Sequence, residues 1–107
     1  MNYTSFIVKI VGQPKQSFFK DKISVTEIPA KFFPLRNKNS NTTIKLSVWG
    51  KLAYDVTKYY KEKDYVIVEG YISLRDLASD SLKKTRDKQV EISVFKIYPF
   101  SLNTLKS

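Results

Sequence analysis

One tryptophan lies between two lysines near the middle of the chain, as Lys45, Trp49 and Lys51. An indole ring offers a flat face on which an unpaired base can stack, and a lysine ammonium can pair with a backbone phosphate. Apolar and polar residues alternate over 43–49, so Trp49 should share a strand face with Lys45 and point away from the core. This pattern favours binding of a single-stranded nucleic acid, with packing of Trp49 in the interior as the alternative.

Further aromatic residues could extend such a surface. Strand alternation places Tyr71 on the same face as Arg75, where it would form a platform beside a cation, or else cover the helix or a subunit interface. Phe32 and Phe33 are adjacent, so both cannot face inward on one strand. One of the two rings could therefore stack on a base, and packing in the core or at an interface is the alternative.

Chemistry that depends on histidine or cysteine is excluded, because the chain contains neither residue. Histidine triads, thiolate nucleophiles, disulfides and zinc fingers are therefore impossible. Catalysis by carboxylates alone stays open, but the ten Asp and Glu residues are not clustered and half of them lie next to Lys or Arg. The sequence predicts no enzyme, no cofactor and no metal site.

The formal net charge of +9 favours a polyanionic partner. Nucleic acid fits best, an acidic membrane surface or protein fits less well, and a role in solubility alone is the alternative. Residues with AT-rich codons, lysine above all, outnumber those with GC-rich codons, which indicates an AT-rich genome such as that of an organelle or a low-GC bacterium.

The elements that must position these residues follow from periodicity and turn signals. Leu52, Val56 and Tyr60 recur at helical spacing, and Tyr59 should support the core beside them. Gly70 inside a strand indicates a bulge. The pattern predicts strands over 6–12, 18–28, 43–49, 65–75 and 89–100, with a helix over 51–60. Core-facing residues of the fourth strand should be Val66, Val68, Ile72 and Leu74.

Five strands with one helix between the third and the fourth are typical of the OB-fold, an all-β barrel. The connection between the last two strands often borders the nucleic-acid groove of such barrels. Here it contains four cations, Lys83, Lys84, Arg86 and Lys88. These cations could contact phosphates, and a solvated turn is the alternative.

A segment of about thirty residues resembles bacterial-type single-stranded DNA-binding proteins. It contains the runs VWGKLA at 48–53, KEKD at 61–64 and VIVEG at 66–70. The resemblance implies an OB-fold that coats single-stranded DNA as a homo-oligomer, a dimer or a tetramer, during replication, recombination or repair. It assigns Trp49 as a stacking aromatic, Lys51 as a phosphate contact and Arg75 as a basic position.

The chain also departs from this family. Thr43, and Asp76 with Leu77, occupy positions where the family often has further stacking aromatics, and the acidic C-terminal tail that recruits partners is absent. Weaker binding to DNA is one consequence that these departures allow. An RNA-binding or primosome-like OB module, or an OB domain for protein interaction, are the alternative functions.

The length predicts one domain over 1–107, with a core over about 4–100 and a short tail over 101–107. No apolar run is long enough to span a bilayer, and no targeting segment is recognised at the start. The compact length and AT-rich composition resemble the small plastid-encoded members of the family in algal chloroplast genomes. We therefore expect a plastid protein encoded in the organelle, with the bacterial cytoplasm as the alternative.

Overall fold

The computed structural model describes residues 3–19, 23–33, 43–76 and 88–101. The predicted cations Lys83, Lys84 and Arg86 lie outside the described residues. Six strands and one helix occur in the order β1 (Tyr3–Ile10), β2 (Lys15–Phe19), β3 (Ile23–Phe32), β4 (Ile44–Trp49), α1 (Lys51–Tyr59), β5 (Tyr65–Asp76) and β6 (Lys88–Pro99).

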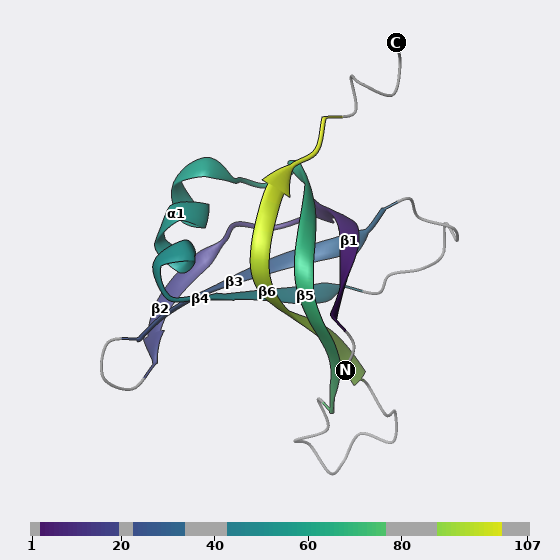
Figure 1. Ribbon diagram of the computed structural model, residues 1–107, viewed down its shortest axis with the longest axis horizontal. Helices are drawn as coiled ribbons and strands as arrows, with labels where there is room; N and C mark the ends of the chain where they lie inside the picture. Colours follow the sequence, from purple (N-terminus) through teal and green to yellow (C-terminus); the bar gives the residue numbers. More distant parts are fainter. Residues whose placement is uncertain (1–2, 20–22, 34–42, 77–87, 102–107) are drawn as a thin grey trace.

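The strands form one sheet that closes on itself (Figure 1). Neighbours follow the order β1-β5-β6-β4-β3-β2, and a further pairing of β1 with β3 joins the two sides. The β4–β6 pair is parallel and the other pairs are antiparallel. Five strands therefore enclose the barrel, and β2 pairs with β3 alone. This arrangement, with the helix after β4, confirms the predicted OB-fold.

The expectation of a single second strand over 18–28 is wrong. Phe19 pairs with Ile23, and Lys15 pairs with Glu27, so the chain reverses and forms a β2–β3 hairpin. The sequence 20–22 contains no Gly, Pro or Asn, and for that reason the local pattern does not reveal the reversal.

The core lies inside the barrel and follows the predicted alternation. Each enclosing strand contributes inward apolar side chains, and the helix adds one more. The buried cluster contains Val8, Ile10, Ile28, Ala30, Ile44, Leu46, Val48, Val56, Val66, Val68, Ile92 and Val94. Ile72 packs against its edge. Leu74 is 64% exposed, against expectation, because β5 and β6 continue their pairing to Asp76 and Lys88, beyond the enclosed interior.

The predicted bulge at Gly70 is present. The β5–β6 register pairs Glu69 with Lys96 but Gly70 with Val94, so Phe95 is an extra residue on β6. A Cβ atom on Gly70 would lie 1.9 Å from the carbonyl oxygen of Ser93. Glycine is therefore required sterically at this bulge.

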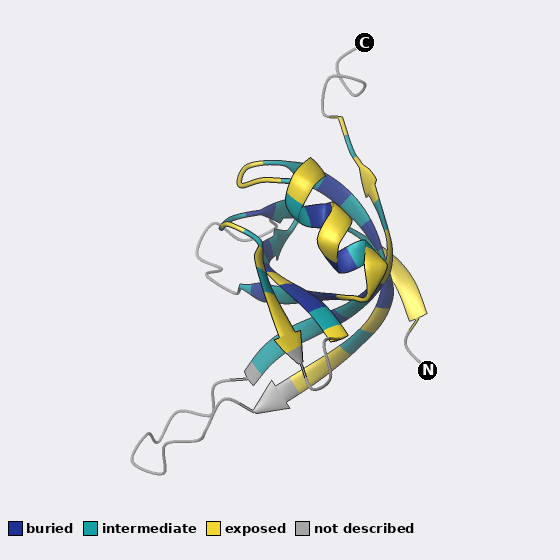
Figure 2. Ribbon diagram, turned by 90° about the vertical axis from the view of Figure 1, so that its left-hand side faces the viewer, coloured by how far each residue is buried: buried dark blue, intermediate teal, exposed yellow. Residues whose placement is uncertain are grey.

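Helix α1 lies across one end of the barrel (Figure 2). It begins after Gly50, whose φ of 75° favours glycine. Val56 and Ala53 are buried, and the buried Thr26 hydroxyl donates a 2.6 Å hydrogen bond to the carbonyl oxygen of Ala53. Tyr60 packs against the core as predicted.

Tyr59 does not support the core as predicted, because it is 73% exposed. The apolar stripe of α1 runs through Leu52, Val56 and Tyr60, and Tyr59 lies to one side of it in the last turn. Among the described residues, no helix is long and apolar enough to cross a membrane.

Candidate nucleic-acid interface

The outer face of β4 contains the tryptophan and one of the lysines that the sequence predicts to bind nucleic acid. Ile44, Leu46 and Val48 point into the barrel, so the alternate residues Lys45, Ser47 and Trp49 point outward. Trp49 is 45% exposed at the end of the strand, next to its β3 partner Val25. The structure thus places the indole on the outside, where one part of it is accessible to a ligand.

The polar residues of this face are already paired with carboxylates. Lys45 Nζ lies 3.4 Å from Glu27 Oε2 on β3, and the lysine side chain is 26% exposed. The Ser47 hydroxyl donates a 2.7 Å hydrogen bond to Glu91 Oε2 on β6, and Ser47 is buried. A phosphate must therefore compete with Glu27 for Lys45. Partly exposed ion pairs contribute only about 0–1 kcal/mol, so this exchange costs little.

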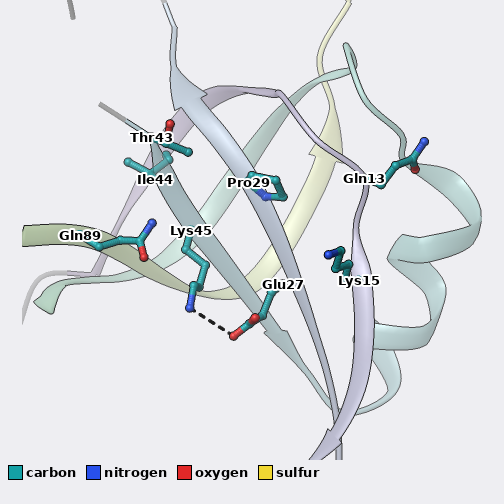
Figure 3. Close-up of a pocket in the computed structure, with 8 residues that line it drawn as sticks. All are labelled: Gln13, Lys15, Glu27, Pro29, Thr43, Ile44, Lys45 and Gln89. Carbon is teal, nitrogen blue, oxygen red and sulfur yellow. Dashed lines mark hydrogen bonds and ion pairs between the residues drawn. The ribbon is translucent and has the colours of Figure 1, made fainter. Parts of the chain in front are cut away.

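A cavity of about 220 Å³ lies beside this ion pair (Figure 3). Figure 3 shows Pro29 near its middle, Gln13 and Lys15 on one side, and Thr43 and Gln89 on the other. Thr43 is the position where the resembled family often has a stacking aromatic, and its small side chain lines the hollow.

Lys51 lies on the other side of Trp49, exposed at the first position of α1. It lines an open groove of about 510 Å³ between the β2–β3 hairpin and the helix. Two exposed aromatic residues line the same groove, Phe18 at 69% and Tyr54 at 52% exposure. Neither residue is among those that the sequence predicts for the site. Tyr54 could have been found, because it lies off the apolar stripe of the helix and within one turn of Lys51.

Tyr71 belongs to a different group of rings, which we call the aromatic cluster: Tyr3, Tyr71 and Phe95. Tyr71 meets Tyr3 at 5.1 Å and Phe95 at 5.2 Å between ring centroids, both edge to face. The Tyr3 hydroxyl donates a 3.3 Å hydrogen bond to Glu69. Partial burial, and then this bond, raise the pKa of Tyr3. The cluster lies on β1, β5 and β6, and Tyr71 is two strands, about 10 Å, from β4.

Phe32 and Phe33 are both half-buried and in contact with other rings. Phe32 lies 5.4 Å from Phe6, between ring centroids, and packs against the core. Phe33 lies 5.0 Å from Tyr65, edge to face. The packing alternative describes both residues in this structure better than a stacking platform does.

Arg75 and Lys88 lie near the paired ends of β5 and β6, where Arg75 is opposite Gln89 and Asp76 is opposite Lys88. Their side chains are outside the described part of the structure, so their proposed contacts stay predictions. Within 3–19, 23–33, 43–76 and 88–101, no group of three or more acidic residues could hold a metal ion.

Comparison with known proteins identifies relatives of this chain. No family model matches the chain. The chain is 53% identical over 107 residues to the "Putative single-stranded DNA-binding protein ycf41" of Trieres chinensis, which covers 99% of this chain and 95% of the relative. A protein of the same name from Porphyra purpurea is 21% identical over 100 residues, which covers 94% of this chain and 87% of the relative.

Two solved structures share the fold. The SSB domain of a Synechococcus protein superposes with a TM-score of 0.67 at 21% identity, covering 92% of this chain and 94% of the other. The second single-stranded DNA-binding protein of Mycobacterium smegmatis, SSBb, gives 0.71 at 17% identity, covering 97% and 90%. Because the Trieres chinensis relative matches along nearly the whole of both sequences, this chain belongs to the ycf41 family.

Proposed function

We propose that this protein binds single-stranded DNA with little sequence preference and catalyses no reaction on it. The observation that carries the proposal is the half-exposed Trp49 on the outer face of β4, with Lys45 on the same face and Lys51 directly after it. The name of the Trieres chinensis relative and the net charge of +9 support the same partner.

Each part of the surface has a distinct task. Trp49 stacks on one base, which contributes about 1–3 kcal/mol to binding whatever the base is. Lys45 and Lys51 neutralise phosphates on either side of it, so affinity falls as salt rises. Lys45 and Trp49 are four strand residues apart, about 13 Å, which spans a few nucleotides. Further contacts to the phosphates of the bound strand would come from five more cations, Arg75, Lys83, Lys84, Arg86 and Lys88.

The test uses the fluorescence of Trp49, which is the single tryptophan of the chain. Titration with oligo(dT) at low salt should quench this emission, and high salt should weaken the binding. Competition with oligo(U) separates DNA binding from RNA binding by the same surface. Unchanged emission together with no gel shift at low salt would contradict the proposal.

A homo-oligomer, a dimer or a tetramer, is part of the same proposal. The aromatic cluster favours a second copy of the chain over DNA as its partner. Its rings already pack edge to face with each other, and Glu69 places a carboxylate beside them, which disfavours a phosphate. Exposed rings grouped in this way are typical of protein interfaces. Light scattering on the full chain measures the mass directly.

A role in plastid DNA replication, recombination or repair completes the proposal. It rests on the ycf41 name of the two algal relatives and on the AT-rich composition of the chain. Detection of the protein in isolated plastids, on DNA that is being replicated, tests both the location and the process.

A further inference from the structure

The groove between the β2–β3 hairpin and α1 has the chemistry of a second base-binding surface. Phe18 on β2 and Tyr54 on α1 both line it, and both rings are more than half exposed. A single exposed aromatic residue is ordinary, but two that line one groove beside a lysine form the alternation of rings and cations that single strands require.

Cations accompany the rings on the helix side. Lys51 lines the groove directly. Lys58 Nζ lies 4.4 Å from the centroid of the Tyr54 ring, an arrangement that helps to fix the ring. Interaction with the Tyr54 hydroxyl raises the pKa of Lys58, so this lysine stays charged at neutral pH. Among the described residues that line the groove there is no carboxylate; Asp55 is on the same helix but does not line it.

The groove is also continuous with Trp49 along the backbone. Trp49 ends β4, Gly50 turns the chain, and Gly50 and Lys51 are both part of the groove. A Cβ atom on Gly50 would meet no atom within 4 Å apart from its two chain neighbours, so the surface is open at this glycine. The amide of Gly50 is held by a 2.9 Å hydrogen bond to the carbonyl oxygen of Ser24, which fixes the hairpin against the start of the helix.

From these observations we propose that a bound DNA strand continues from Trp49 past Gly50 into this groove, where its bases stack on Tyr54 and Phe18. The inference rests on the proposed binding of single-stranded DNA and extends its path. It gives the chain additional stacking residues on the helix and the hairpin, whereas Thr43, on the opposite side of Trp49, has no ring.

The experiment compares short and long oligo(dT), of about 6 and about 16 nucleotides, within the range of site sizes known for OB-folds. Binding is followed by Trp49 fluorescence in the wild type and in Phe18→Ala, Tyr54→Ala and Tyr54→Phe. We expect Phe18→Ala and Tyr54→Ala to weaken binding of the long oligonucleotide by about fivefold or more, as the loss of one stacked base implies. Binding of the short one to Trp49 should stay the same. Tyr54→Phe keeps the ring and should bind both as the wild type does.

Tyr59→Ala is the matched control, because Tyr59 is a more exposed tyrosine on the same helix and does not line the groove. If Phe18→Ala and Tyr54→Ala bind both lengths as the wild type does, the groove proposal is wrong while the proposed function stands. It is equally wrong if these variants change only the oligomeric mass. If neither oligonucleotide quenches the Trp49 fluorescence of the wild type, the proposed function itself fails.

Discussion

Two exposed aromatic groups on this barrel differ in what surrounds them. Trp49 has lysines on both sides along the chain and an open groove beyond Gly50. The aromatic cluster of Tyr3, Tyr71 and Phe95 has its rings packed on each other and Glu69 hydrogen-bonded to Tyr3. Exposure alone therefore does not identify a stacking platform. The charges beside the rings distinguish a surface for DNA from a surface for protein: lysines flank Trp49, whereas a carboxylate lies beside the aromatic cluster.

Gly70→Ala should have the largest effect, because it acts on the strand pair that supports the aromatic cluster. The new Cβ would lie 1.9 Å from the Ser93 carbonyl oxygen, so β5 and β6 must separate locally. We expect a loss of about 3 kcal/mol or more in the free energy of unfolding, measured by denaturant titration. Gly50→Ala, where space is open but a φ of 75° with a ψ of −144° is adopted readily only by glycine, should cost about 1–3 kcal/mol. Equal losses in the two variants would contradict the steric explanation.

Trp49→Ala should have the largest effect on DNA binding. Loss of one stacked base removes about 1–3 kcal/mol, which is about fivefold to 150-fold in the dissociation constant. Gel shift with oligo(dT) measures the loss. More than half of the Trp49 side chain is covered, so the variant should unfold at a somewhat lower temperature, and a cooperative thermal transition excludes misfolding as the cause.

Tyr71→Ala provides the other side of the comparison. Its ring contacts Tyr3 and Phe95, so its removal should lower the mass measured by light scattering and leave the affinity for a short oligonucleotide within about twofold. The opposite result, an unchanged mass with weaker binding of DNA, would show that Tyr71 is part of the DNA-binding surface. In that case the distinction between the two aromatic groups would not hold.

Local pattern was enough to predict much of this structure. Strand alternation placed Ile44, Leu46 and Val48 inside and Trp49 outside, and the isolated Gly70 indicated the bulge. These features depend on residues close in sequence. The reversal between Phe19 and Ile23 contains no Gly, Pro or Asn, and Asp21 between two lysines is too weak a turn signal to predict it.

Contacts between distant residues were not predictable in the same way. The ion pair of Lys45 with Glu27 joins residues 18 positions apart, and Phe18 lines one groove with Tyr54 only because the hairpin folds against α1. Exposure of Leu74 depends on where the barrel ends, a property that alternation along one strand does not contain. The sequence therefore predicts which types of residue form the candidate site. The structure is needed to show which of these residues contact each other.

Glu27→Gln should have the smallest effect and gives the finest test of the comparison. Glu27 pairs with Lys45 at 3.4 Å, so the neutral amide should release the ammonium for phosphate and remove a negative charge from the DNA surface. We expect affinity for oligo(dT) to rise by about twofold to fivefold at low salt, consistent with a surface pair of about 0–1 kcal/mol. One additional phosphate contact should also steepen the salt dependence of log K by about 0.7. Glu69→Gln is the matched control, because Glu69 lies beside the aromatic cluster, and it should change neither quantity. If both substitutions raised affinity equally, the gain would come from net charge alone, and Lys45 would have no specific place on the path of the DNA.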